Sequence, residues 1–161
     1  MTRLLLYSFF ISLLFHTGCK TTSDLEKVLI PRFMIESRGT EYGALRGSVM
    51  KLPYSKMEIV VDREPVISEL DIINVELVKV ELGLALLIEL NDTGARALYR
   101  TSVTNKGNRL VFTVNNKAIG ARRLDQAIND GKLYTFVEVR EEEMGQLVLD
   151  LKASLSELRK R

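Results

Sequence analysis

The sequence predicts an α+β fold in which a mostly antiparallel sheet is covered by two longer helices and one short helix. Three observations lead to this class. Apolar side chains alternate with a period of two between residues 73 and 90, as in β-strands. They recur at helical spacing in two segments, 91–104 and 141–161, and both segments have helix-terminal residues at their ends. Short strand-like segments separated by Gly, Pro or Asn lie before and between these helices.

The first third of the folded part is expected to contain three short strands. Residues 32–37 and 48–52 are predicted to form a pair of strands around a Gly-containing loop at 38–47. Residues 57–61 form a further strand, which ends before Pro65 because proline cannot donate a hydrogen bond to a ladder.

The alternating segment changes phase in the middle. Its apolar residues are Ile73, Val75 and Leu77, followed by Val78, Val80 and Leu82. A slip of one residue turns the apolar face to solvent unless a bulge restores the register, so we predict a β-bulge near Leu77 and Val78. Residues 84–90 are apolar on both faces, which predicts a central strand.

A helix begins after this strand, with Asn91 or Asp92 as its N-cap, and ends before Gly107. Its predicted inner stripe consists of Ala95, Leu98, Tyr99 and Val103. Residues 110–114 then form a strand, and Asn115 with Asn116 forms a tight turn because asparagine tolerates positive φ.

A short return strand, a short helix and a last strand are predicted after this turn. The return strand is Ala118–Ile119, and Leu124, Ala127 and Ile128 mark a short helix that Gly131 closes. Residues 133–139 form the last strand.

The terminal helix begins with three glutamates and ends with three basic residues, an arrangement that suits the helix dipole. Its apolar stripe consists of Met144, Leu147, Val148, Leu151, Leu155 and Leu158. Such a stripe packs on the protein's own sheet or forms a partner-binding or coiled-coil surface, and packing on the sheet is the favoured interpretation.

The amino terminus has the layout of a secretory signal. Arg3 precedes about a dozen apolar residues at 4–15, too few for a comfortable transmembrane helix. The Gly18–Cys19 junction resembles the lipobox of bacterial lipoproteins, although His16 stands where that family has Leu. The resemblance implies cleavage before Cys19 and lipidation of this cysteine; an unmodified amino-terminal membrane anchor is the alternative.

These features divide the chain into three parts: a signal peptide at 1–18, a polar tether at 19–30, and one α+β domain at 31–161. The resemblance implies a protein of the cell envelope, lipid-anchored and facing the periplasm. Lys20 follows the lipidated cysteine where Asp would indicate the inner membrane, so the outer membrane is favoured.

The mature part is nearly neutral and lacks several chemistries. Removing Arg3 from 23 basic residues leaves 22 against 21 acidic residues, which gives no electrostatic reason to expect nucleic acid. His16 is the only histidine and Cys19 the only cysteine. We therefore predict no catalytic residues, no metal site and no cofactor, and expect that the protein is not an enzyme.

Three charged groups are weaker site candidates. Asp62, Glu64, Glu69 and Asp71 could form a carboxylate metal site or a hydrolase pair, and Arg96 with Arg100, or Arg122 with Arg123, could bind an anion. Solvated surface is the simpler interpretation of each group.

Residues 84–152 resemble the head subdomain of the first periplasmic domain of SecD, a membrane protein that assists bacterial protein export. The matching motifs are residues 90–95 (LNDTGA), Ser102, Asn105, Gly107, 110–112, 117–119, 128–131 (INDG) and a terminal Glu- and Leu-rich helix. Arg122 and Asn116 depart from the pattern, which has Pro and Gly there.

This resemblance implies a non-catalytic binding module that contacts polypeptide or envelope proteins, through an edge strand or a groove, with a link to protein export. The alternative is a structural subunit of an envelope complex that uses the terminal helix as its interface.

Overall fold

The computed structural model describes residues 28–37 and 47–160, so the lipobox, the signal peptide and most of the tether lie outside the described residues. The predicted α+β class is confirmed: within these ranges the chain forms antiparallel sheets, two α-helices and one 3-10 turn. The elements are β1 (Pro31–Ile35), β2 (Gly47–Lys51), β3 (Glu58–Asp62), η2 (Glu69–Asp71), β4 (Ile72–Val80), β5 (Gly83–Leu90), α3 (Asp92–Thr104), β6 (Arg109–Val114), β7 (Lys117–Arg123), β8 (Lys132–Thr135) and α4 (Glu141–Leu158).

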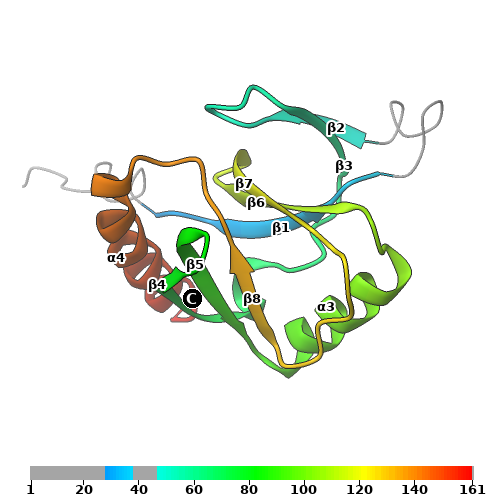
Figure 1. Cartoon of the computed structure of the whole chain (residues 1–161). Coiled ribbons are helices and arrows are strands. Elements are labelled where there is room, and N and C mark those ends of the chain that lie inside the picture. The colour runs from blue at the N-terminus through cyan, green and yellow to red at the C-terminus, as the bar shows by residue number, and fades with distance from the viewer. Residues whose placement is uncertain (1–27, 38–46, 161) are drawn as a thin grey trace, which may run out of the picture.

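The described strands divide into three sheets, with the orders β1-β6-β7, β2-β3 and β4-β5-β8. Figure 1 shows them as successive layers, with β2 and β3 at the top, the β1-β6-β7 sheet in the middle and the third sheet below. The predicted central strand is confirmed, because β5 pairs with both β4 and β8.

The middle sheet is buried on both faces. One face of β1 and β6 packs against β4-β5-β8 and both helices, through residues such as Phe33 and Phe112, whose rings stack 4.7 Å apart. Alternate residues, among them Met34 and Val111, form a smaller cluster with the β2-β3 hairpin. Because successive side chains of a strand point to opposite faces, the same strands contribute to both hydrophobic clusters.

The expected pairing of the first two strands is wrong. Strand β1 pairs with β6, and β2 pairs with β3. Because β1 is apolar on both sides, it is buried between two layers, whereas β2 has exposed residues and lies at the surface. The alternation of apolar residues predicts that a segment is a strand, but it does not predict which other strand it pairs with.

The bulge predicted near Leu77 and Val78 is also misplaced. The ladder between β4 and β5 is regular there, and its register shift falls between Ile72 and Asn74. The change of phase has another cause: Val78 and Val80 lie on the outer face of this sheet, opposite Val75, which is fully buried.

Helix α3 is capped by Asn91, whose side chain accepts a hydrogen bond from the Gly94 amide at 2.8 Å. The predicted inner stripe is partly wrong, because Tyr99 and Val103 are each about half exposed. The buried positions are Gly94, Leu98, Thr101 and Ser102. Small residues allow the helix to approach its neighbours closely, and this contact, rather than the apolar stripe alone, sets its rotation.

The predicted short helix at 124–131 does not form. Leu124 and Ile128 are buried as expected, but the main chain of this segment bonds to other elements. The Leu124 amide donates to the Asn108 carbonyl, and the Ile128 amide donates to Ser102 Oγ. These partners replace the internal hydrogen bonds that a helix would need.

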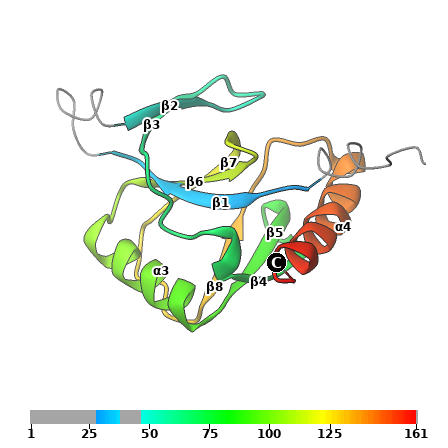
Figure 2. The ribbon, with the colours of Figure 1, turned by 180° about the vertical axis from the view of Figure 1, so that it is seen from behind.

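The stripe of α4 belongs to the main core. Met144, Val148, Leu151 and Leu155 are at most 7% exposed and belong to the main cluster. Figure 2 shows α4 lying beside β4. The stripe is therefore not free to form the interface that the structural-subunit alternative requires.

The chain joins the fold before the expected boundary at residue 31. The amide of Leu29 donates to Ser154 Oγ on α4, and the amide of Ile30 donates to Oδ1 of Asn115 in the β6–β7 turn. Among the described residues, no helix has the length and apolar character needed to cross a membrane.

The predicted asparagine turn is confirmed, with φ of 50° and 62° at Asn115 and Asn116.

One ion pair ties β1 to the 3-10 turn. Nε and Nη2 of Arg32 donate to the two carboxylate oxygens of Glu69 at 2.7 and 3.1 Å. The hydrogen bond from Arg32 is the main reason why the pKa of Glu69 lies below its ordinary value. The pair thus stabilises the fold fully above the ordinary pKa of a glutamate, and this contribution is lost as the pH falls through the lowered value.

Glu69→Gln should lower the free energy of unfolding at neutral pH by about 1 kcal/mol, because it removes a charged, two-point hydrogen bond that is partly buried. The difference from wild type should shrink in acid, where protonated Glu69 resembles glutamine. Urea unfolding at a series of pH values measures both effects. Glu58→Gln is the control, because the Lys51–Glu58 pair is more than half exposed and should contribute little. A pH-independent loss in the Glu69 variant would contradict the assignment.

Candidate functional site: a groove between two sheet edges

An open groove of about 610 Å³ lies where the edge of one sheet meets the edge of another. Strand β7 is one of the two edge strands of the middle sheet, and β8 is one of the two edge strands of the β4-β5-β8 sheet. After β8 the chain crosses to β7, where Val137 pairs with Gly120. The lining residues come from four segments: Val80, Glu81, Leu82, Ala121, Arg122, Arg123, Asp125, Gln126, Ile128, Tyr134 and Phe136.

Large apolar side chains are exposed in this groove. Leu82, at the tip of the β4–β5 hairpin, is 85% exposed, and Tyr134 and Phe136 are 40% and 42% exposed. Tyr134 and Phe136 are two residues apart in extended chain, so they project to the same side. Exposed apolar residues gathered in one concave surface are typical of a binding site.

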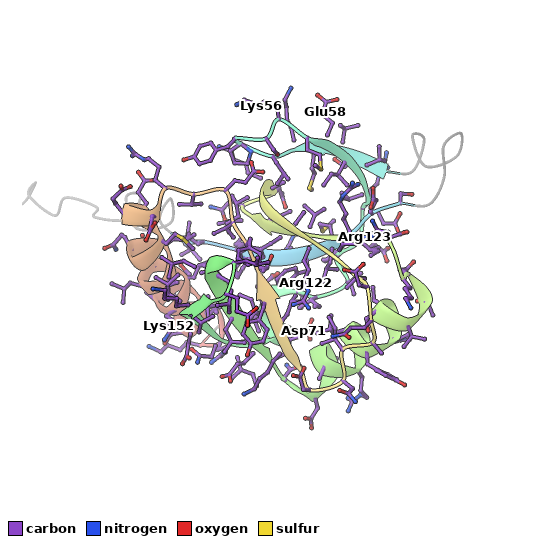
Figure 3. The ribbon with its side chains drawn as sticks, viewed as in Figure 1. Lys56, Glu58, Asp71, Arg122, Arg123 and Lys152 are labelled. Atoms are coloured by element: carbon purple, nitrogen blue, oxygen red, sulfur yellow. The ribbon has the colours of Figure 1, made fainter. Side chains whose placement is uncertain are left out.

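Two arginines lie on the β7 side of the groove, where Figure 3 labels them. Arg122 Nη1 donates to the main-chain carbonyl of Tyr134 at 2.7 Å. Arg123 Nε forms an ion pair with Asp125 at 3.3 Å, and both side chains are largely exposed. The contact of Arg122 occupies a carbonyl on the edge strand, and such contacts reduce unwanted pairing with other strands.

Close main-chain packing fixes the junction between β7 and the segment that follows β8, beside the groove. A Cβ atom added at Gly120 would lie 2.2 Å from the Phe136 carbonyl oxygen, so only glycine fits. The amide of Glu138 donates to the Ile119 carbonyl at 2.6 Å. Together these contacts hold the Phe136 main chain against β7.

Glu138 extends this junction to the β2–β3 hairpin. Its Oε2 accepts hydrogen bonds from the amides of Tyr54 and Ser55 at 2.6 and 2.9 Å. Partial burial acts to raise the pKa of Glu138, but these hydrogen bonds and the nearby charge of Lys56 outweigh it and leave the pKa below its ordinary value. The carboxylate is thus charged at neutral pH and fixes the hairpin turn, near the labelled Lys56 in Figure 3.

The acidic group proposed as a carboxylate site is not assembled as one. Glu69 is paired with Arg32, and Asp71 accepts hydrogen bonds from the amide and hydroxyl of Ser68 at 2.9 and 2.7 Å. Asp62 and Glu64 are exposed. No group of three or more His, Cys, Asp or Glu that could hold a metal occurs within residues 28–37 and 47–160.

The two arginine pairs are placed differently from each other. Arg122 and Arg123 line the groove, whereas Arg96 and Arg100 lie on the outer side of α3. Cys19 lies outside the described residues. Sequence reasoning missed Leu82, Tyr134 and Phe136; the available signal was that apolar residues occupy the outward positions of strand-like segments.

Fold and groove together define an α+β domain with an open, partly apolar groove between two sheet edges. No family model matches the chain, and no curated protein matches it. Two solved structures of SecDF have a similar fold. One is a crystal structure of SecDF in a super-membrane-facing form, with 17% identity, a TM-score of 0.56, and coverage of 78% of this chain and 18% of that chain.

The other is a structure of SecDF as a membrane component that enhances protein export, with 17% identity, a TM-score of 0.57, and coverage of 79% of this chain and 64% of that chain. The fold is therefore SecD-like, and the chain spans less than two thirds of either SecDF chain. The similarity also extends beyond residues 84–152, which are only 69 of the 161 residues.

Proposed function

We propose that the protein is a non-catalytic binding module, lipid-anchored through Cys19 at the periplasmic side of the cell envelope, that holds an extended polypeptide in a role linked to protein export. The observation that carries this proposal is the groove between β7 and β8, with Leu82, Tyr134 and Phe136 exposed in it. The SecD-like fold and the Gly18–Cys19 junction support the export link and the anchor.

The groove suits an extended chain better than a compact ligand. It is open to solvent and bounded along one side by an edge strand, β8, of four residues. An extended peptide rises about 3.3 Å per residue, so three or four of its residues would lie along β8. Its apolar side chains would contact Tyr134 and Phe136, and its main chain would compete with Arg122 for the Tyr134 carbonyl.

Replacing both Tyr134 and Phe136 with serine should weaken binding of an unfolded polypeptide by about tenfold or more, because buried aromatic contacts dominate such interfaces. The probe is fluorescently labelled lysozyme, reduced and alkylated so that it cannot fold, titrated with the full chain in detergent. Native lysozyme should not bind. The matched control is Tyr54→Ser combined with Leu149→Ser, since both residues are more than half exposed and lie outside the groove.

Equal loss in the groove and control variants, or equal binding of native and unfolded lysozyme, would contradict the polypeptide assignment. The anchor is tested separately on the mature product from cells, whose mass should lack residues 1–18 and include acyl chains. A mass that retains Met1, or a bare Cys19 thiol, would overturn the anchor and leave the groove assignment standing.

A further inference from the structure

A second exposed surface lies on the outer side of α3, away from the groove. Arg96, Tyr99 and Arg100, together with Ala95 and Asn129, line an open hollow of about 630 Å³. We call this surface the α3 arginine face. Asn129 belongs to the 124–131 segment, whose residues Gln126 and Ile128 line the groove, so this segment lies between the two surfaces.

The α3 arginine face carries two positive charges and no carboxylate. Arg96 and Arg100 are four residues apart, so they lie side by side on the helix and repel each other. Neither forms an ion pair within the described ranges; Arg96 only approaches Thr93 Oγ1, at 3.5 Å. No ion pair with either arginine offsets this repulsion in the described part of the protein.

Most other described arginines have a defined partner. Arg32, Arg109, Arg123 and Arg140 each pair with a carboxylate, and Arg122 and Arg159 donate to main-chain carbonyls. The two arginines of α3 stand out because they lie side by side on the helix, and each can donate two parallel hydrogen bonds to a carboxylate.

The same helix face also exposes apolar groups. Tyr99 lies between the two arginines and is 50% exposed, and Val103, one turn further, is 52% exposed. The apolar pattern of the sequence predicted that both residues are buried, but the rotation of α3 about its axis exposes them to solvent. Tyrosine and arginine are among the residue types that contribute most at the centres of protein interfaces.

We infer that the α3 arginine face binds an acidic segment of a partner protein, with carboxylates on Arg96 and Arg100 and an apolar side chain on Tyr99. Charge complementarity specifies an anionic occupant, and the position of α3 favours protein over lipid. The chain enters the domain beside α4, where Leu29 bonds to Ser154, and Figure 1 shows α3 at the opposite end. A lipid at Cys19 would then attach to the domain at the end away from the α3 arginine face.

The test measures binding of a short fluorescent peptide of alternating Glu and Leu to the full chain in detergent, by anisotropy. Changing Arg96 and Arg100 together to Glu should weaken binding at least tenfold, and Tyr99→Ser should weaken it to a smaller extent. Lys152→Glu combined with Lys160→Glu is the matched control, because it changes the net charge equally at two exposed positions, one within α4 and one just after it. This control should bind like wild type, and a peptide with Gln in place of Glu should not bind.

Circular dichroism checks that each variant is folded, and Arg96→Gln with Arg100→Gln replaces the Glu variant if it is not. Equal weakening by the lysine control, or binding of the Gln peptide, would overturn the inference. So would binding to phosphatidylglycerol vesicles without binding to the peptide, since the occupant would then be lipid. The Tyr134 and Phe136 double variant should keep its affinity for the acidic peptide, so this inference and the proposed function can fail independently.

Discussion

Leu151→Ala is expected to lower the free energy of unfolding by about 2–5 kcal/mol, the usual cost of truncating a fully buried leucine. Leu151 is 0% exposed, and it belongs to the cluster in which α4 packs against the β4-β5-β8 sheet. Truncation removes apolar contacts and leaves a cavity that the surrounding strands can only partly fill. This change therefore tests whether the stripe of α4 is core or interface.

Urea unfolding followed by circular dichroism measures the loss, and size-exclusion chromatography reports the mass. Leu149→Ala, two residues away on the same helix, is the control: Leu149 is 61% exposed, and its truncation should change stability by less than about 0.5 kcal/mol. If Leu151→Ala kept wild-type stability but changed the oligomeric mass, the stripe would be an interface and the structural-subunit alternative would return.

Gly120→Ala should destabilise the protein by about 2 kcal/mol or more, because the added methyl group meets main-chain atoms that cannot rotate away. Its Cβ would lie 2.2 Å from the Phe136 carbonyl oxygen and 3.1 Å from Val137 Cα. To accommodate this methyl group, the main chain at Phe136 and Val137 must move away from β7. Thermal unfolding measures the loss, and the unfolded-polypeptide titration should show weaker binding, because this crossing positions Phe136 in the groove.

Gly145→Ala is the matched control. Gly145 lies inside α4, and an added Cβ meets nothing within 4 Å. Alanine is the better helix former, so this variant should be more stable by about 0.5–1 kcal/mol. A Gly120→Ala variant as stable as wild type would mean that β7 and the Phe136 segment are not packed as closely as described.

Local patterns predicted those elements whose structure depends on neighbours in the chain. Apolar residues on both faces of 84–90 identified β5 as a central strand, and the glutamate-rich start of α4 lies where the helix begins. The Asn115–Asn116 turn was predicted because few residue types adopt positive φ readily. In each case the physical signal is carried by a few consecutive residues.

The site was less predictable. The arginine pairs were visible as charges in the sequence. The sequence did not distinguish Arg122, which donates to the Tyr134 carbonyl, from Arg96 and Arg100, which form no ion pair in the described ranges. Leu82 and Phe136 were missed because an apolar residue in a strand-like segment is normally assigned to the core. Exposure depends on what the other layers cover.

The sequence by itself determined the α+β class, the period of each main element and the positions of its turns, because period and turn chemistry are local properties. Only the tertiary structure decided which strands pair, which side of α3 faces inward, and that residues 124–131 form an irregular segment bonded to Asn108 and Ser102. The reason is the same in each case. These features depend on the burial of one segment against others far away in the chain, and a periodic pattern states that a face is apolar without stating what will cover it.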